Sequence, residues 1–370
     1  MEVLEVVAFI VGVALVLYTI RAAIRLFLVP RALQLYLARF VFVMVRRVFW
    51  LFANHRHAFV HRDAVMAFYA PVALLSLFTL WIVLVLMGYT AMYWALGNHP
   101  LSIAFTESGS ALLTLGFARG RNLGTIALMF TEALIGLGLL AVFIAYLPSL
   151  YNAFSRREVG VSKVQVRAGR PPSGIYLIEL AWTVGRMETL KTLWSEWETW
   201  FVEVDETHTS FPPLVFYRSG HPEESWVISG GAILDGASLY VSSVDAPRTP
   251  EPEFMIRAGH LCLRHIATFY WIRVPDDPAP TDPISIERSE FDAAYDRLAE
   301  VGVPMKPDRA QCWRDFAGWR VNYDTALIEL AKLTMAPQAP WSSDRYPDRH
   351  YLPPALPWLR SRLAQRGGSG

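Results

Sequence analysis

Residues 64–106 contain no Asp, Glu, Lys or Arg, and this long uncharged run limits what the chain can fold into. A bilayer core about 30 Å thick needs roughly 20 apolar residues of helix, because each helical residue rises about 1.5 Å. Residues 67–96 meet this requirement. Residues 123–147 predict a second span, which we expect Pro148 to close.

A third apolar run, residues 4–29, is long enough to span if Arg21 and Arg25 extend their side chains to the headgroups. The chain begins with Glu2 and Glu5, carries no early base, and shows no small-residue cleavage site. We therefore predict an uncleaved first transmembrane helix rather than a signal peptide.

Beyond Arg156 the composition changes: charged residues become dense and no long apolar run recurs. The whole chain is 53% hydrophobic and 18% charged, against roughly 25% charged in ordinary soluble domains. Its net charge of +1 supplies no field that would attract nucleic acid. Cys262 and Cys312 are too few for a disulfide scaffold or a Cys-rich metal site, so we expect two buried, reduced thiols.

The arginines predict how the spans are oriented. Residues 21–62 contain eight Arg and no acidic residue, and Arg156, Arg157 and Lys163 follow the last span. Because cytoplasmic loops are enriched in Lys and Arg, both segments should face the cytoplasm. We therefore expect a multi-pass protein of the plasma (cell inner) membrane, with its N-terminus outside and its C-terminal domain in the cytoplasm.

The basic segment at residues 31–63 alternates apolar residues with arginines, a pattern typical of an amphipathic helix at the inner leaflet. Two interpretations stay open: an anchor that only holds the chain at the interface, or a lever that couples the membrane to the pore. The segment also holds His55, His57 and His61, which are either solvated or sensors of pH.

Residues 97–120 are too short to cross the membrane twice and too apolar for a solvated loop. Pro100 suits the first turn of a helix, and apolar residues recur at helical spacing afterwards. We predict a short re-entrant pore helix at residues 101–113, followed by extended chain at residues 114–118. Irregular backbone at membrane depth must be buried in protein or line a cavity. One chain supplies one such segment, so a pore would need several chains around an axis.

The order of outer helix, pore helix, Thr-Leu-Gly-Phe-Ala and inner helix over residues 67–155 resembles the pore of the potassium-channel superfamily, with its Thr-Val-Gly-Tyr-Gly signature. In that family four copies of the loop direct backbone carbonyls at an axis, where they replace the ion's water shell. The resemblance implies a homotetramer that conducts potassium, with Phe117 packed behind the filter. It implies a gating hinge at Gly136 and Gly138, and a selectivity filter formed by Thr114, Leu115, Gly116, Phe117 and Ala118.

Departures from the family pattern leave the permeant ion open. Ala118 replaces the second filter glycine, at a cost on the order of 1 kcal/mol if that position needs a positive φ. Arg119 and Arg121 stand at the outer mouth, where an acidic residue commonly follows the signature, unless Arg119 pairs with Glu107 of a neighbouring chain. A weakly selective cation pore, an anion-tolerant pore, and a filter that opens only when the mouth rearranges are the alternatives.

Glu107 and Glu132 are the acidic residues expected at membrane depth, where an ionised carboxylate costs several kcal/mol unless it is paired or wet. We expect both to brace the filter, Glu132 through hydrogen bonds to Ser108, Ser110 or the pore-helix backbone. The alternative makes Glu132 an ion or proton ligand in the cavity.

The second half of the chain predicts an all-α domain. Its tryptophans at helical spacing, Trp194, Trp197 and Trp200, indicate core rather than a cofactor site. Ser285 is a candidate N-cap, but Arg288 does not complete a capping box there. The expected helices cover residues 174–202, 223–241, 253–273, 284–301 and 308–335, and a Pro- and Arg-rich tail follows at residues 341–365.

No motif for chemistry appears in this half. Phosphate-binding glycine loops are absent, and His260 and His265 are poorly spaced to share a metal on one helix. The acids Glu287, Glu290, Asp292, Asp296 and Glu300 are typical of a solvated helix face. We therefore predict no catalytic residue, no metal site and no cofactor.

The sequence thus predicts an all-α tetrameric cation channel with three transmembrane helices, a re-entrant pore helix and an α-helical cytoplasmic domain whose ligand, if any, is not apparent. One alternative is a membrane-anchored signalling or interaction protein with a degenerate, non-conducting loop, and another is a tethered enzyme. The predicted segments are a first helix (1–30), an interfacial helix (31–63), a pore module (64–155), a cytoplasmic domain (156–366) and a linker or tag remnant (367–370).

Overall fold

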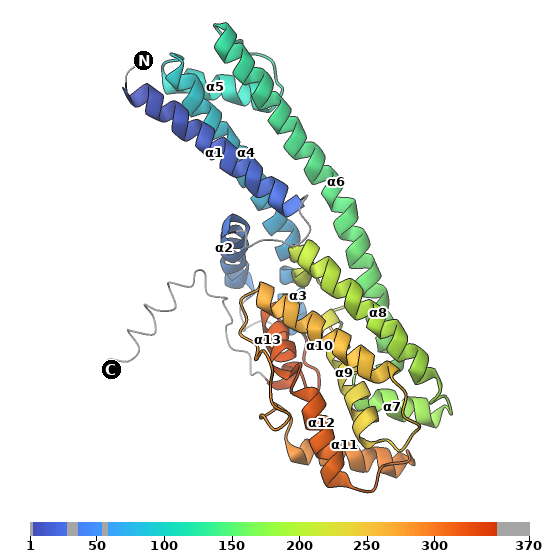
Figure 1. Ribbon diagram of the computed structural model, residues 1–370. Helices are drawn as coiled ribbons and strands as arrows, with labels where there is room; N and C mark the ends of the chain where they lie inside the picture. Colours follow the sequence, from blue (N-terminus) through green and yellow to red (C-terminus); the bar gives the residue numbers. More distant parts are fainter. Residues whose placement is uncertain (1–2, 28–35, 54–57, 346–370) are drawn as a thin grey trace. The chain divides into compact units, whose positions relative to one another are not determined.

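The computed structural model describes residues 3–27, 36–53 and 58–345, and the regular elements in these ranges are helices, with one isolated β-bridge between Val244 and Met305 (Figure 1). The chain divides into two compact units. The first unit comprises Met1–Val48 and Tyr69–Asn152, and the second comprises Phe49–Phe68 and Ala153–Gly370.

Three stretches of helix are long and apolar enough to cross a membrane: Val3–Phe27, Phe59–Ala95 and Leu123–Ala168. The three expected spans are therefore present as helices. The helices of the first unit are α1 (Val3–Phe27), most of α2 (Tyr36–Phe52), α4 (Tyr69–Ala95), α5 (Leu101–Leu112) and the first part of α6 (Leu123–Ala168).

Helix α1 packs antiparallel against α4 through a pair of glycines. A Cβ on Gly12 would lie 2.5 Å from the carbonyl oxygen of Gly88, and a Cβ on Gly88 would lie 2.7 Å from a methyl of Val16. Small residues permit such close approach, which favours association of helices in lipid. At the end of the pair, His99 Nε2 lies 3.5 Å from Glu5 Oε1, so the start of α1 and the end of α4 are neighbours.

The prediction that Pro148 closes the last span is wrong. Helix α6 continues through Pro148 as far as Ala168. A proline inside a helix removes one amide donor, which here would have bonded to the carbonyl of Ile144. The helical residues on both sides outweigh this local loss, so one continuous helix links the first unit to the second.

The basic segment is not one helix in the described residues. It contains α2 and α3 (Phe59–Ala67), while residues 28–35 and 54–57, with His55 and His57, lie outside the description. His61 is exposed. Arg46 is 1% exposed and lies over the ring of Tyr69, 6.0 Å from its centre, so at least this arginine packs inside the first unit instead of reaching water.

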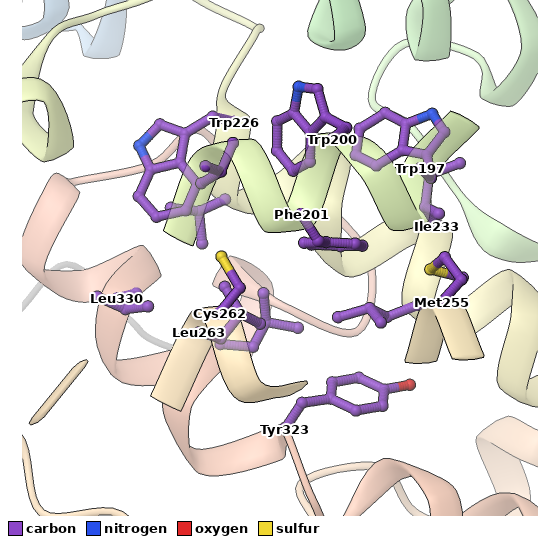
Figure 2. Close-up of a cluster of buried hydrophobic side chains, with 14 of the residues drawn as sticks. Trp197, Trp200, Phe201, Trp226, Ile233, Met255, Cys262, Leu263, Tyr323 and Leu330 are labelled. Carbon is purple, nitrogen blue, oxygen red and sulfur yellow. The ribbon is translucent and has the colours of Figure 1, made fainter. Parts of the chain in front are cut away.

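The second unit is built around the tryptophans that the sequence assigned to core. Trp194, Trp197 and Trp200 are buried in one cluster with Cys262 (Figure 2). Cys312 is also a buried free thiol. The helices of this unit beyond α6 are α7 (Gly174–Thr183), α8 (Thr189–Ser210), α9 (Trp226–Ser243), α10 (Glu251–Phe269), α11 (Arg288–Val301), α12 (Arg309–Arg320) and α13 (Asp324–Thr334), with short 3-10 turns η1 (Pro212–Phe216) and η2 (Ser343–Arg345).

Two predicted helices are each divided in the structure. The 174–202 helix breaks between α7 and α8, where Gly185 adopts a φ of 70° that ends the first helix. The 308–335 helix breaks between α12 and α13. The buried Arg320 at the end of α12 bonds Asp324 at the start of α13, so the turn between them is held by an ion pair.

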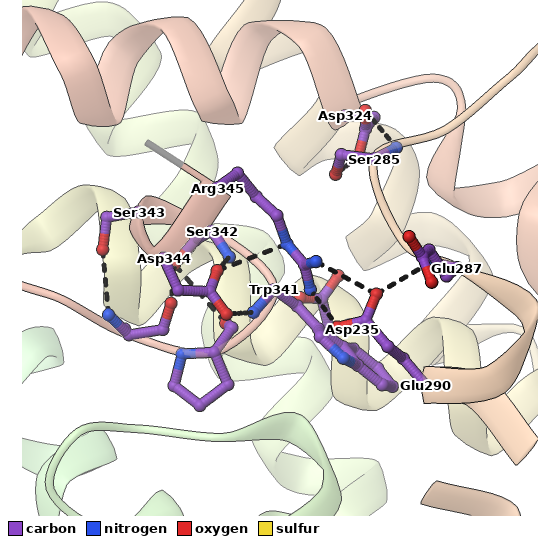
Figure 3. A network of polar contacts seen from close by, with 12 residues as sticks. Asp235, Ser285, Glu287, Glu290, Asp324, Trp341, Ser342, Ser343, Asp344 and Arg345 are labelled. Atoms are coloured by element: carbon purple, nitrogen blue, oxygen red, sulfur yellow. Dashed lines mark hydrogen bonds and ion pairs between the residues drawn. The ribbon is translucent and has the colours of Figure 1, made fainter. Parts of the chain in front are cut away.

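The predicted start of the 284–301 helix is also wrong. Helix α11 begins at Arg288 with Glu287 as its N-cap, and Glu287 and Glu290 form a full capping box. Ser285 lies outside the helix, and its hydroxyl donates to Asp324 at 2.7 Å. Arg345 from η2 donates to Glu290 in the same region (Figure 3). The rest of the predicted tail and residues 367–370 lie outside the described residues.

Candidate functional site

Helix α5 lies between α4 and α6. The Ser108 hydroxyl oxygen on α5 lies 3.1 Å from the carbonyl oxygen of Leu86 on α4. At the far end of α5, a Cβ on Gly136 of α6 would lie 2.5 Å from the carbonyl oxygen of Leu112. Since Leu123 begins α6, the end of α5 lies opposite a point about 20 Å along that helix. Helix α5 therefore runs from the end of α4 toward a point in the first third of α6.

Ser110 holds the chain that follows α5. Its carbonyl accepts from the amides of Leu115 at 2.8 Å and Gly116 at 3.4 Å. Its hydroxyl oxygen accepts from the amide of Ala118 at 3.1 Å. The amide of Thr114 donates to Ala111 at 3.0 Å. Four of the five amides of residues 114–118, those other than Phe117, thus donate back to the end of α5.

The carbonyl oxygens of residues 114–118 differ from these amides in their hydrogen bonding. Within the described residues, none of them accepts a hydrogen bond. Backbone carbonyls are strong acceptors that proteins rarely leave unpaired in buried positions. Residues 114–117 are exposed and Ala118 is partly buried, so these carbonyls lie near the surface of the single chain without a donor from its described residues.

The loop is not the regular extended strand that the sequence predicted. Thr114 and Gly116 both have left-handed backbone, with φ of 55° and 73°. For a β-branched residue such as Thr this conformation costs on the order of 1–2 kcal/mol, and such strain is concentrated at functional sites. Ala118 has no positive φ, so the alanine that replaces the family's glycine carries no penalty of this kind.

The side chains of the loop are exposed in the single chain. Leu115 is 60% exposed and Phe117 is 66% exposed. The resemblance implies that Phe117 packs behind the filter, but the described part of the chain leaves most of this side chain uncovered. Any such packing would have to come from a neighbouring chain.

Glu132 joins three helices at the centre of the first unit. The side chain is 0% exposed. It accepts hydrogen bonds from Ser108 on α5 at 2.5 Å and from Tyr93 on α4 at 3.0 Å. The bond to Ser108 is one of those that the sequence analysis named, whereas the bond to Tyr93 is an additional contact. Both partners are neutral hydroxyls, and they fix α5 against α4 and α6.

Glu107, at the other end of α5, accepts a hydrogen bond from the buried amide of Asn98. Within the described residues, Arg119 and Arg121 are exposed and make no ion pair. The expected pairing of Arg119 with Glu107 involves a second chain and stays a prediction. The sequence analysis did not predict that Ser110 bonds to the loop at residues 114–118. It also did not predict Asn98 as the partner of Glu107, or Tyr93 as a partner of Glu132.

The start of α6 and its two glycines complete the site. Asn122 and Thr125 exchange backbone and side-chain hydrogen bonds and cap α6, with Asn122 Oδ1 accepting from the Thr125 amide at 2.9 Å. Position 136 requires glycine, because a Cβ there would clash with the carbonyl oxygen of Leu112. Gly138 has open space where a Cβ would stand. Their assignment as a gating hinge stays a prediction.

A second group of contacts lies in the second unit, on the segment formed by residues 212–218, which we call the joint. Arg157, buried on α6, donates to the carbonyls of Leu214 and Tyr217, each at 2.8 Å. Trp200 of α8 donates to the carbonyl of Arg157 at 3.1 Å. Arg157 Nη1 also lies 3.2 Å from Nε2 of the buried His208, and this burial and charge lower the pKa of His208 well below its usual 6.5.

The same joint holds the helix before α4. Arg218 lies 3.0 Å from Asp63 of α3 and donates to the carbonyl of Met335 at 2.9 Å. The chain that leads into α4 and the chain that leaves through α6 are therefore fastened to one short segment of the second unit.

Among the described residues, no group of three His, Cys, Asp or Glu side chains could hold a metal ion. His265 pairs with Asp205 at 2.8 Å, and the pair is partly solvent-exposed. No family model, no curated protein and no solved structure matches this chain.

Proposed function

We propose that this chain is the subunit of a tetrameric ion channel that passes cations, potassium first, through a filter of backbone carbonyls at residues 114–118. The observation that carries the proposal is the difference between the loop's amides and carbonyls: four of its five amides donate back to α5, whereas its five carbonyls accept no hydrogen bond in the described chain. Carbonyls arranged around an axis replace an ion's water shell.

Several copies are needed because one chain supplies one loop. The resemblance to the potassium-channel superfamily favours four. Exposed Leu115 and Phe117 agree with a neighbouring chain beside the loop, because apolar side chains at an axis of assembly would otherwise face water. The strained φ of Thr114 is a cost that the hydrogen bonds to Ser110 offset.

Glu132 and Gly136 hold the helices that support the loop. Glu132 ties the outer, pore and inner helices together through Tyr93 and Ser108. Gly136 lets the inner helix touch the last carbonyl of the pore helix. Both hold the loop at a fixed depth, as carbonyl coordination requires.

Two arginines near the loop bear on the selectivity of the proposed channel. Four chains would place up to eight guanidinium groups there, from Arg119 and Arg121. These charges repel cations over roughly 8 Å at physiological salt. A weakly selective or anion-tolerant channel is the alternative that these two residues favour, and a non-conducting signalling protein is the alternative of another class.

We propose that the N-terminus and the α4–α6 connection lie outside a plasma membrane and that the second unit lies in the cytoplasm, because the arginine-rich segments favour the cytoplasmic side. Glu5 beside His99 supports one part of this, because the start of α1 and the end of α4 then share one side. The joint would transmit movements of the cytoplasmic unit to both helices that flank the pore loop.

The test is reconstitution of the full chain into planar bilayers with opposed potassium, sodium and chloride gradients, in which the reversal potential gives the selectivity. Gly116→Asp should abolish the current while the oligomer survives, because a carboxylate would occupy a loop position that has left-handed backbone and open space. Gly220→Asp is the matched control, since Gly220 is exposed in the second unit with open space around it.

A wild-type reversal potential that follows the potassium gradient supports the potassium filter, and one that follows chloride overturns it. Undiminished current in Gly116→Asp would place the permeation path elsewhere. Absence of current in the wild type, with an intact tetramer, would favour the non-conducting signalling protein.

A further inference from the structure

The second unit contains a pocket of about 600 Å³ that no part of the proposed channel uses. It lies where the end of α9, the start of α10 and the outer part of α12 meet, and its walls include Tyr240, Pro252 and Trp319. Ligand pockets in proteins are typically about 300–1,000 Å³ and mostly apolar, with a few polar groups that fix the orientation of the ligand. The pocket has the size and lining for a small organic molecule.

Some charged side chains that line this pocket form an ion pair with each other, and others bond only to neutral groups. Arg248 pairs with Glu253 at 2.9 Å, so these two neutralise each other. Lys306 donates to the carbonyl of Val241 at 2.7 Å, and Arg314 donates to the side-chain oxygen of Gln311 at 2.6 Å.

Neither Lys306 nor Arg314 has a carboxylate partner within the described residues. Asp315 also lines the pocket, and its carboxylate accepts from Gln311 at 2.6 Å. Two cations against one acid leave an excess positive charge, which favours an anion.

Besides its charged residues, the pocket has aromatic side chains that could contact a ligand. Trp319 and Tyr240 are partly buried and both line the pocket. The indole N–H of Trp319 donates to no acceptor within the described chain. A partly buried indole with a free donor offers a flat surface for stacking and a hydrogen bond to a polar group of the ligand.

We propose that this pocket binds a small organic anion that carries a planar ring, with Lys306 and Arg314 holding the anionic group and Trp319 packing against the ring. A phosphate or a carboxylate on such a ring shares this chemistry. The site deepens the proposed function by naming a ligand class for the second unit. Its binding does not depend on ion conduction, however, so either proposal can fail without the other.

The experiment is isothermal titration calorimetry on the full chain in detergent, with two probes. AMP carries a phosphate on a ring-bearing scaffold, and 2-naphthoate carries a carboxylate directly on a ring. We expect saturable binding of at least one probe at one site per chain. Arg314→Gln should weaken that binding about tenfold, because a hydrogen bond to a charged group contributes roughly 1.5 kcal/mol or more.

Arg273→Gln is the matched control, since Arg273 is exposed in the same unit and does not line the pocket. Trp319→Phe should weaken binding less than Arg314→Gln, because the ring remains while the indole donor is lost. Binding of AMP alone identifies the phosphate source, and binding of 2-naphthoate alone identifies the carboxylate source. The proposal is overturned if neither probe binds, if adenosine binds as tightly as AMP while 2-naphthoate does not bind, or if Arg314→Gln binds as the wild type does.

Discussion

The two units of this protein bury charge in different ways. In the second unit, Arg320 is 0% exposed and lies between two carboxylates, those of Asp235 and Asp324. Its remaining nitrogen donates to the carbonyl of Trp341 at 2.6 Å. In the first unit, Glu132 is equally buried but meets only the hydroxyls of Tyr93 and Ser108.

The difference shows what each buried group does. Arg320 joins α12, α13 and α9 by balanced charge, so it specifies how the second unit packs. Within the described residues Glu132 forms no ion pair, and its hydrogen bonds join α6 to α4 and α5, the helix before the loop at residues 114–118. A costly group that is held by hydroxyls alone indicates a positional role at a functional site. Four predictions test this contrast.

The largest expected effect is on the second unit. Arg320→Met would leave Asp235 and Asp324 buried without their cation, and removing one partner of a buried ion pair costs about 3–5 kcal/mol. We expect a large drop in the denaturant midpoint of the full chain, followed by tryptophan fluorescence. Arg297→Gln is the control, because it breaks the more exposed pair with Glu179 and should cost no more than about 1 kcal/mol. Equal midpoints for the two variants would contradict the assignment.

Glu132→Leu should act on the pore and not on the second unit. It leaves the hydroxyl of Tyr93 without its acceptor, at about 1–3 kcal/mol for a buried group, whereas Ser108 can still donate to the carbonyl of Leu86. We expect loss of current and a less stable tetramer in detergent, with an unchanged unfolding midpoint of the second unit. Glu132→Gln keeps an acceptor oxygen and should retain most of the current. If Gln fails as Leu does, the negative charge itself is required, and the ion-ligand alternative gains support.

The third prediction concerns pH. His208 is neutral in the folded protein because its pKa lies well below 6.5, while the unfolded chain takes up a proton near that value. The unfolded state therefore binds more protons below pH 6.5, and stability should fall as the pH falls, by about 1.4 kcal/mol per pH unit. Urea unfolding between pH 7 and pH 5 measures it. His208→Gln should show a shallower slope over this window, and an identical slope would exclude His208 as the cause.

The smallest effect is expected at the mouth. Replacing Arg119 and Arg121 by Gln should raise cation conductance at low salt and change it little at high salt, because the charges are exposed and screened. Single-channel conductance in about 20 mM and about 1 M potassium chloride measures this, the screening length being roughly 20 Å and 3 Å respectively. An unchanged conductance at low salt would show that these groups are paired in the assembly or face away from the mouth.

The sequence predicted the three apolar helices and the short helix at residues 101–112 well, because apolar runs and helical spacing are local signals. It placed the tryptophan core and the two buried cysteines correctly for the same reason. It failed at Pro148, where tolerance of one lost hydrogen bond depends on the helix around it. It also failed at Glu287, because the capping box was sought from Ser285, two residues too early.

The contacts that support the candidate site were harder to predict. Ser110 is an ordinary small residue on a pore helix, and its role depends on how the chain turns after Leu113. Arg157 meets the carbonyls of Leu214 and Tyr217, which lie 57 and 60 residues away in the sequence. Main-chain acceptors leave no trace in residue type, so such partners become visible only in three dimensions.

The joint at residues 212–218 has a mechanical consequence. Because it grips α3 through Asp63 and α6 through Arg157, the spacing between these two anchor points is set by the backbone of a few residues. A small rotation of that backbone would move both anchor points together, so that α3 and the Arg157 turn of α6 could not shift independently.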